Sequence, residues 1–141
     1  KAIENSNKVA MTLSDLFCVE RHKTHFLELA KNRLDIIFAN EQEILSLIDA
    51  KSIDEVISFS KNLKKMIIIT RGENGAVAVN QNEVFECLAK KNLKIVDLTG
   101  AGDLFAAGYL HGVINNLTIP ECLQKGTELS SKIIEKIGAR I

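Results

Sequence analysis

Short apolar runs rich in β-branched residues alternate with helical periodicity through the first half of the chain. Such runs predict strands of a parallel sheet with both faces covered, and three of them occur, at residues 9–13, 35–39 and 65–70. Two segments between them place apolar residues on one helical face, at 21–32 and 52–63. Ser52 followed by Glu55 forms a capping-box pattern, which predicts where the second of these helices begins.

The second half of the chain has a different pattern. Two short apolar segments, 76–79 and 83–87, are separated by an Asn-Gln-Asn turn and predict a β-hairpin. A strand and two helices are predicted next, at 93–96, 101–115 and 118 to about 136. With a further short helix capped at Asn40, the predicted order is βαβααβ, hairpin, β and αα, which is typical of a doubly wound α/β fold. Such a fold has a mostly parallel sheet flanked by helices, and ligands bind at the carboxyl ends of its strands.

Composition excludes several classes of function. The 141 residues include 18 Lys plus Arg and 18 Asp plus Glu, so the net charge is zero and supplies no long-range attraction for phosphate backbones or anionic lipid. We therefore expect neither nucleic acid nor a membrane as a partner. At 141 residues, 46% of them hydrophobic, the chain is long enough to bury roughly two-thirds of its unfolded surface in a compact fold. Lys1 in place of an initiator methionine predicts that the chain is a piece of a longer protein.

Cysteine usage and apolar run length bear on location. Cys18, Cys87 and Cys122 form no C-x-x-C pair, which favours a reducing, cytoplasmic setting over a disulfide framework or a zinc knuckle. The longest apolar runs are too short to cross a bilayer, and no targeting leader is visible. Cys18, His22 and His25 have helical spacing, but an exposed basic helix start explains them better than a zinc site does.

The most informative motif follows the predicted strand 93–96 and opens the helix 101–115. Small residues at Gly100, Ala101 and Gly102 let a ligand approach the backbone, and the amides and dipole of the helix point toward it. This arrangement predicts an anion hole. Asp103, in the first helical turn, is placed to accept a proton from a hydroxyl that attacks phosphorus. The alternative is structural: the glycines make a tight turn, and Asp103 complements the helix dipole.

Two further motifs also follow predicted strands. Asn40 and Glu43 come at the end of the strand 35–39, where on spacing alone they form an ordinary helix cap. Thr70, Gly72 and Gly75 lie between the strand 65–70 and the hairpin. Glycines there allow a nucleotide to approach the backbone, although a simple turn into a hairpin produces the same pattern.

Residues 97–110 resemble the second signature of the ribokinase-like (PfkB) carbohydrate kinase family, D-T-x-G-A-G-D followed by a small-residue helix. Residues 12–18 resemble a segment of the adenosine-kinase and sugar-kinase branch of the same family. The resemblance implies that Asp103 is the catalytic base and that the amides of Gly100 to Gly102 stabilise the transferring phosphoryl group. It also implies that Asp97 and Thr99 help to bind a monovalent cation such as K⁺. Leu98 departs from the family pattern between these two residues and leaves the cation role open.

The same resemblance gives roles to the other motifs. It implies that Asn40 and Glu43 organise Mg²⁺ around the nucleotide phosphates, with Glu43 acting through water. It further implies ATP contacts from the residues Thr70, Gly72, Gly75, Gly126 and Thr127.

These observations predict ATP-dependent phosphoryl transfer to a hydroxyl of a small-molecule sugar or nucleoside. Residues 1–141 would be the C-terminal, ATP-binding and catalytic portion of a PfkB-type kinase domain, a partial domain with its β-hairpin near the nucleotide and without the N-terminal acceptor-binding part and lid. A homodimer of the full-length protein is compatible with these observations. One alternative is a non-catalytic nucleotide-binding fragment, inactive without the missing part, and another is a purely structural α/β domain.

Other nucleotide-binding motifs fit poorly. The dinucleotide pattern G-x-G-x-x-G fails because Phe105 stands at its third glycine, and Asp103 would repel a pyrophosphate. No G-x-x-x-x-G-K-[ST] sequence occurs. His111 is interpreted as a packed or rim histidine, because Asp103 already fills the role of the base.

Overall fold

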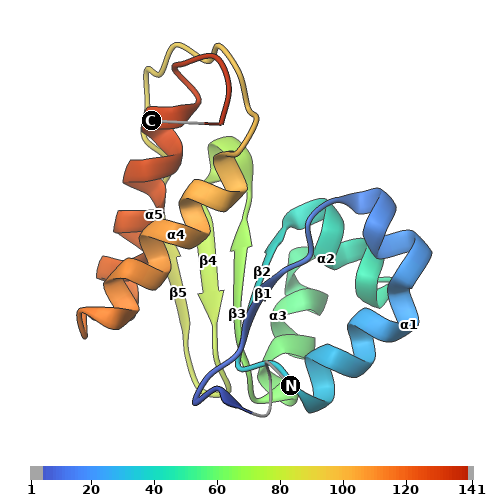
Figure 1. The fold of residues 1–141 in the computed structure, drawn as a ribbon. Coiled ribbons are helices and arrows are strands. Elements are labelled where there is room, and N and C mark those ends of the chain that lie inside the picture. The colour runs from blue at the N-terminus through green and yellow to red at the C-terminus, as the bar shows by residue number, and fades with distance from the viewer. Residues whose placement is uncertain (1–4, 140–141) are drawn as a thin grey trace. The chain divides into compact units, whose positions relative to one another are not determined.

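The computed structural model describes residues 5–139 and has the predicted alternation of strands and helices (Figure 1). The elements are β1 (Ala10–Thr12), α1 (Leu16–Asn32), β2 (Ile36–Asn40), α2 (Glu41–Ile48), α3 (Ile53–Leu63), β3 (Met66–Thr70), the 3₁₀ turn η2 (Gly72–Asn74), β4 (Ala76–Val79), β5 (Val84–Cys87), α4 (Ala101–Ile114) and α5 (Ile119–Ile133). The strands form one sheet in the order β1-β2-β3-β4-β5, and β1 runs parallel to β2 with Ala10 opposite Ile36. The predicted α/β class is confirmed.

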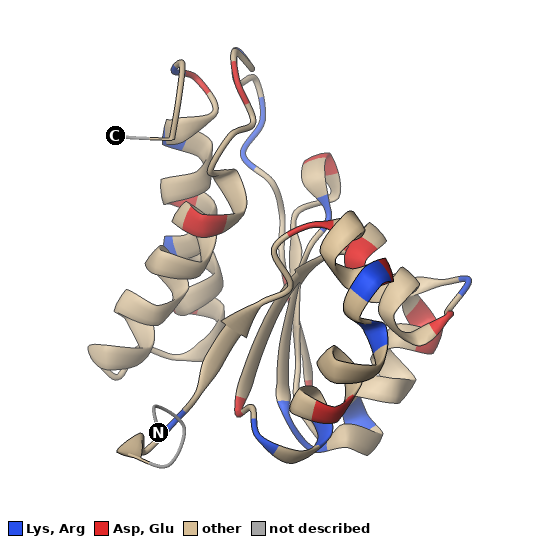
Figure 2. Cartoon of the chain, turned by 45° about the vertical axis from the view of Figure 1, so that its right-hand side comes forward, with Lys and Arg blue, Asp and Glu red and all other residues tan. Residues whose placement is uncertain are grey.

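The backbone of the described chain divides into two compact units. The amino-terminal unit comprises residues 5–69 and 78–84, and the carboxyl-terminal unit comprises residues 70–77 and 85–139. Figure 2 shows basic and acidic residues interspersed along the chain, with neither sign confined to one element. Within residues 5–139, no helix combines the length and the apolarity that crossing a bilayer requires.

The core of the amino-terminal unit is built from the predicted apolar runs. Ile67, Ile68 and Ile69 of β3 are completely buried, as expected for a strand covered on both faces. Helix α1 begins at Leu16, five residues before the predicted start at residue 21, because Asp15 caps it by accepting a hydrogen bond from the Cys18 amide at 2.8 Å. The backbone at His22 is non-helical, so two helical pieces meet near the predicted start.

Helices α4 and α5 of the carboxyl-terminal unit pack side by side through glycines (Figure 1). A Cβ on Gly108 would lie 2.6 Å from the Lys125 carbonyl oxygen, and one on Gly126 would lie 2.8 Å from that of Phe105. The two backbones are therefore in direct contact, with no room for a side chain at either glycine.

Replacing Gly108 by alanine is expected to lower the free energy of unfolding by about 1–3 kcal/mol, because the added methyl meets backbone that cannot rotate away. Urea denaturation measures the effect. Ala107→Ser, at the adjacent exposed position, is the matched control and should leave the midpoint nearly unchanged. Equal midpoints for the two variants would show that α4 and α5 can separate without cost.

One predicted strand is wrong. Residues 93–96 lie outside every strand, and the Val96 amide instead donates a hydrogen bond to the Ile134 carbonyl at 2.7 Å. Ile95 is 65% exposed and Val96 is 44% exposed, so the apolar pattern that predicted a strand does not mark a buried face. Helix α5 also ends at Ile133, three residues before the predicted end at about 136.

Candidate active site

The loop that precedes α4 is shaped by Gly100, the N-cap residue of that helix. Its φ is +78°, a left-handed conformation that favours glycine, and a Cβ there would lie 2.8 Å from the Ala139 Cβ. The Gly100 carbonyl accepts a hydrogen bond from the Leu104 amide at 2.9 Å, which closes the first turn of α4. Gly100 is therefore required by the backbone of the protein itself, whatever ligand is bound.

Two backbone amides in the first turn of α4 donate no hydrogen bond within the described chain, and we call them the open amides. The Ala101 amide donates to the Leu98 carbonyl at 3.1 Å, so it is committed to the turn. The amides of Gly102 and Asp103 donate to no residue between 5 and 139. A Cβ on Gly102 would meet no atom within 4 Å and the residue is exposed, so this turn is open on the side of the Gly102 Cα. The predicted anion hole thus rests on Gly102 and Asp103 more than on Ala101.

Asp103 is exposed and is the acidic residue in the first turn of α4. Its carboxylate forms no hydrogen bond or ion pair with another residue in the described part of the chain. An unpaired, solvent-facing carboxylate beside two open amides can accept a proton from a bound hydroxyl while the amides bind an anion. His111, on the same helix, is also exposed, with its Nε2 3.4 Å from the Asn115 side-chain nitrogen. It is therefore a surface residue and not a packed one.

Asp97 holds the start of this loop by three hydrogen bonds. Its Oδ1 accepts from the Thr99 amide at 2.9 Å and from the Thr99 hydroxyl at 2.7 Å. Its Oδ2 accepts from the Gly138 amide at 2.9 Å. The Thr99 hydroxyl, followed by the two amides, holds the pKa of Asp97 below its usual value. Asp97 and Thr99, the predicted cation ligands, do lie together.

Asn40 and Glu43 form a closed capping box at the start of α2 in the amino-terminal unit. The Asn40 amide donates to Glu43 Oε2 at 2.8 Å, and its side-chain nitrogen donates to Oε1 at 2.7 Å. Asn40 Oδ1 in turn accepts from the Glu43 amide at 2.8 Å. The helix-cap interpretation is confirmed, and the magnesium role stays a prediction.

The chemistry of Glu43 suits Mg²⁺ only indirectly. Both of its oxygens already accept a hydrogen bond, and the residue is 5% exposed. Within residues 5–139, no group of three or more His, Cys, Asp or Glu side chains is arranged to hold a metal ion. Mg²⁺ is commonly held by one or two carboxylates, phosphates and several waters, so Glu43 fits a water-mediated role beside a nucleotide.

Burial raises the pKa of Glu43, while in the other capping box the Thr118 hydroxyl lowers the pKa of Glu121. The contributions of Glu43 and Glu121 to folding stability should therefore change with pH in opposite directions. A raised folded-state pKa gives stability that is present below the unfolded-state pKa and is lost as pH rises through the folded value. A lowered one gives stability that is present above the unfolded-state pKa and is lost as pH falls.

We therefore expect Glu43→Gln to become more stable relative to the wild type as pH rises from 4 to 7, since glutamine carries no charge to bury. Glu121→Gln, the matched control, should become less stable relative to the wild type over the same range. Urea denaturation at several pH values measures both trends. Parallel trends in the two variants would contradict the assignment of burial at Glu43.

The segment from Thr70 to Gly75 forms the 3₁₀ turn between β3 and β4. Gly72 is exposed with a φ of +56°, and a Cβ there would meet no atom within 4 Å. Gly75 is buried with a φ of +85°, and its Cβ would lie 2.0 Å from the Cys87 carbonyl oxygen. Only Gly72 is therefore open to a nucleotide, whereas Gly75 is required by the chain. Thr70 is partly buried at the end of β3.

Gly126 and Thr127 lie on α5. Gly126 is buried against Phe105, as described above, and this packing accounts for the glycine without a nucleotide. Thr127 is partly exposed, and its hydroxyl lies 3.6 Å from the Cys87 Sγ. Cys87 therefore contacts two of the predicted ATP-binding residues, Gly75 and Thr127. The ATP contacts of all these residues stay predictions.

Gly138 and Ala139 are not among the predicted site residues, although they contact Asp97 and Gly100. Gly138 has a φ of +86°, a left-handed conformation that favours glycine, and this requirement is the signal that the sequence carries. Of the predicted site residues, Asn40 and Glu43 belong to the amino-terminal unit. All the others belong to the carboxyl-terminal unit.

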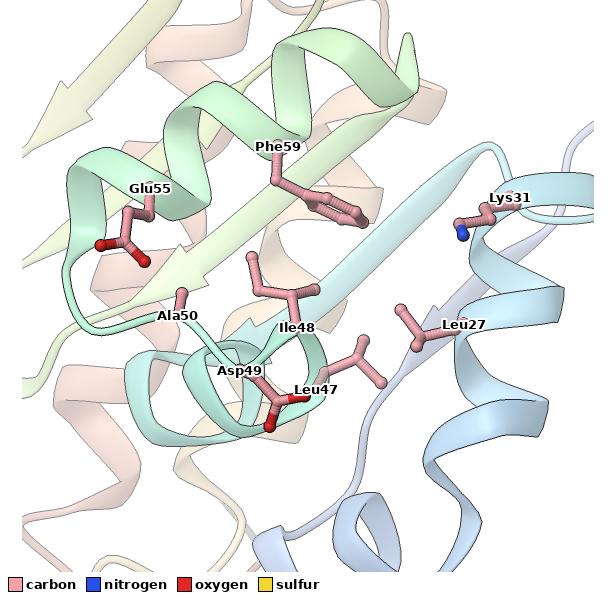
Figure 3. Close-up of a pocket in the computed structure, with 8 residues that line it drawn as sticks. All are labelled: Leu27, Lys31, Leu47, Ile48, Asp49, Ala50, Glu55 and Phe59. Carbon is pink, nitrogen blue, oxygen red and sulfur yellow. The ribbon is translucent and has the colours of Figure 1, made fainter.

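A groove of about 350 Å³ lies among α1, α2 and α3 of the amino-terminal unit (Figure 3). None of the predicted site residues lines it. Two acidic side chains on its edge are engaged by the chain, Asp49 with the Lys23 ammonium group and Glu55 with the Lys51 amide. With both carboxylates paired, Lys31 is the remaining charged side chain of the lining.

Comparison with known proteins places this geometry in a family. The family model described as pfkB family carbohydrate kinase matches residues 1–141. The chain is 33% identical to a cytidine kinase from Thermococcus kodakarensis over 109 residues, which is 76% of this chain and 39% of that protein. It is also 29% identical to a ribokinase from Lactococcus lactis over 107 residues, which is 76% of this chain and 34% of the relative.

Solved structures have the same fold. A probable sugar kinase from Rhizobium etli superposes with a TM-score of 0.92 at 37% identity, over 97% of this chain and 42% of that one. An adenosine kinase from Sinorhizobium meliloti superposes with a TM-score of 0.91 at 38% identity, over 95% of this chain and 41% of that one. The chain thus spans less than half the length of these relatives. With its whole length matched by the family model and its ribokinase-like fold shared with these kinases, the chain belongs to the pfkB family of carbohydrate kinases.

Proposed function

We propose that this chain supplies the ATP-binding and catalytic portion of a kinase that transfers the γ-phosphoryl group of ATP to a hydroxyl of a sugar or nucleoside. The observation that carries the proposal is the start of α4, where two open amides lie beside the exposed carboxylate of Asp103. Phosphoryl transfer needs little more from a protein than positioning and charge stabilisation. This arrangement is suited to both tasks.

In the proposed reaction, Asp103 accepts the proton of the acceptor hydroxyl as its oxygen attacks the γ-phosphorus. The bond from that phosphorus to the β,γ-bridging oxygen breaks, and ADP leaves. The amides of Gly102 and Asp103 stabilise the negative charge on the transferring group, aided by the dipole of α4. Gly72, with its open face, lies along the nucleotide together with Thr70 and Thr127.

Mg²⁺, when bound with ATP, would neutralise charge on the phosphates. We propose that Glu43 orients the waters of that ion, because its carboxylate is fixed on both oxygens by Asn40 and faces little solvent. For K⁺, the candidate residues are Asp97 and Thr99. Three protein donors already use the Asp97 carboxylate, which leaves a small share of its coordination for a cation.

The acceptor class is proposed from the relatives. Those reported above are named as kinases of cytidine, ribose, adenosine or an unspecified sugar, so a small polyhydroxylated molecule is the common acceptor. The cysteines of the chain are free, which agrees with a cytoplasmic, reducing setting. We also propose that the full-length protein forms a homodimer. A molar mass in solution of twice that of one chain would support this proposal.

A second candidate function is nucleotide binding without transfer by this chain alone. It is favoured by the span of the match, since the relatives are more than twice as long as the part that aligns. Calorimetry with MgATP on this chain, beside a coupled kinase assay with adenosine, cytidine and ribose on chain and intact enzyme, separates the two candidates. We expect binding by both and transfer only by the intact enzyme. No binding and no transfer by either protein would overturn both candidates.

A further inference from the structure

We propose, on the basis of the proposed function, that Asp97 is a positioning residue that fastens the anion-hole loop (residues 97–103) to the terminal turn (residues 134–139). Its carboxylate joins these two segments and thereby fixes the direction of the open amides at Gly102 and Asp103. The residue would act through the loop and would not touch the reacting atoms.

Both oxygens of the Asp97 carboxylate accept hydrogen bonds from the chain. Oδ1 accepts two hydrogen bonds from Thr99, from its amide at 2.9 Å and from its hydroxyl at 2.7 Å. Oδ2 accepts the third, from the Gly138 amide at 2.9 Å, across 41 residues of sequence. One oxygen therefore shapes the loop, and the other anchors that shape to a distant segment.

The two segments meet along their length. The Val96 and Asp97 amides both donate to the Ile134 carbonyl, at 2.7 and 3.2 Å. At the other end of the contact, Gly100 approaches Ala139 so closely that a Cβ on the glycine would lie 2.8 Å from the alanine Cβ. The terminal turn is thus a template against which the anion-hole loop is formed.

The conformation of the loop near Thr99 sets the direction of the open amides. Thr99 immediately precedes Gly100, whose left-handed φ of +78° turns the chain into α4. The Leu98 carbonyl accepts from the Ala101 amide within the same turn. A rotation of the peptides near Thr99 would therefore redirect the Gly102 and Asp103 amides. A displacement of about 1 Å in such a group costs on the order of 100-fold in rate.

The test uses the intact enzyme with Asp97→Asn. Asparagine keeps one oxygen for Thr99 but offers the Gly138 amide a donor in place of an acceptor. We expect kcat to fall about 100-fold, the KM for ATP to stay within about twofold, and amide hydrogen exchange in residues 134–139 to become faster. Lys136→Ala, an exposed position in the same turn, is the control and should change none of these.

A second pair of variants keeps the inference testable if Asp97→Asn fails to fold. Thr99→Val removes the hydroxyl donor, and Thr99→Ser restores it, so serine should recover most of the kcat that valine loses. The inference is overturned if kcat falls without faster exchange in residues 134–139, or if serine is no better than valine. It is also overturned if added K⁺ restores Asp97→Asn, since Asp97 would then act through a cation.

The wild type separates this inference from the proposed function. An active wild type with an equally active Asp97→Asn variant overturns the positioning role alone. A wild type that transfers no phosphoryl group to any acceptor in the panel overturns the proposed function, and the inference falls with it.

Discussion

Replacing Asp103 by asparagine in the intact enzyme is expected to lower kcat by about 10²–10⁴-fold, because asparagine cannot accept the proton of the acceptor hydroxyl. The side chain is exposed and makes no contact that the fold requires within the described residues. The free energy of unfolding should therefore change only by the lost interaction with the helix dipole, about 0.3–1 kcal/mol. A coupled kinase assay and urea denaturation measure the two effects.

Asp54→Asn is the matched control for this prediction. Asp54 is also an exposed acid in the first turn of a helix, at the start of α3, so its replacement costs a similar interaction with a helix dipole. It lies outside the proposed site and should leave kcat unchanged. If Asp103→Asn keeps near-normal turnover, Asp103 is not the base and the structural interpretation of this aspartate stands.

The second large effect is expected at Gly102, where activity and stability should change in opposite directions. Gly102→Ala adds a methyl that meets no atom of the protein within 4 Å, in a helical turn where alanine is preferred over glycine. Stability should be equal or higher, by up to about 1 kcal/mol. The same methyl stands beside the open amides, where it would hinder an approaching phosphoryl group, so kcat/KM should fall by on the order of 10²-fold.

Gly100→Ala is the informative comparison for Gly102→Ala. Its φ of +78° and its approach to Ala139 make alanine strained there, so this variant should lose stability as well as activity. Thermal melting and the coupled assay on both variants test the contrast. A fully active Gly102→Ala protein would show that no ligand approaches these amides, and would remove the observation on which the proposed function rests.

Local signals in the sequence predicted most of the fold. Asn40, Ser52 and Thr118 each precede a helix that begins at the next residue, because side-chain caps act within one turn. The strand 65–70 was predicted from its unbroken apolar run, which is completely buried at three positions. The strand predicted at 93–96 is absent because its apolar side chains are exposed, and exposure depends on contacts distant in sequence.

Local signals in the sequence also predicted part of the candidate site. The small residues before α4 and the cap at Asn40 are visible in the sequence. The structure adds which backbone amides already donate a hydrogen bond within the protein. That Ala101 is engaged while Gly102 is open depends on the turn at Leu98. The contact of Asp97 with Gly138 could not be predicted from spacing, because nothing local indicates which of the distant amides will reach a carboxylate.

The hydrogen bond between Asp97 and Gly138 also has a consequence for biosynthesis. Segments that are distant in sequence can meet only after the later one has been made, and chains generally fold from the amino end as they emerge from the ribosome. The loop that carries the candidate base is complete at residue 103, yet its anchor is at residue 138. A nascent chain would therefore hold an unformed candidate loop until α5 had been synthesised and docked. A message truncated before that point would yield a protein with the proposed catalytic residues but without their arrangement.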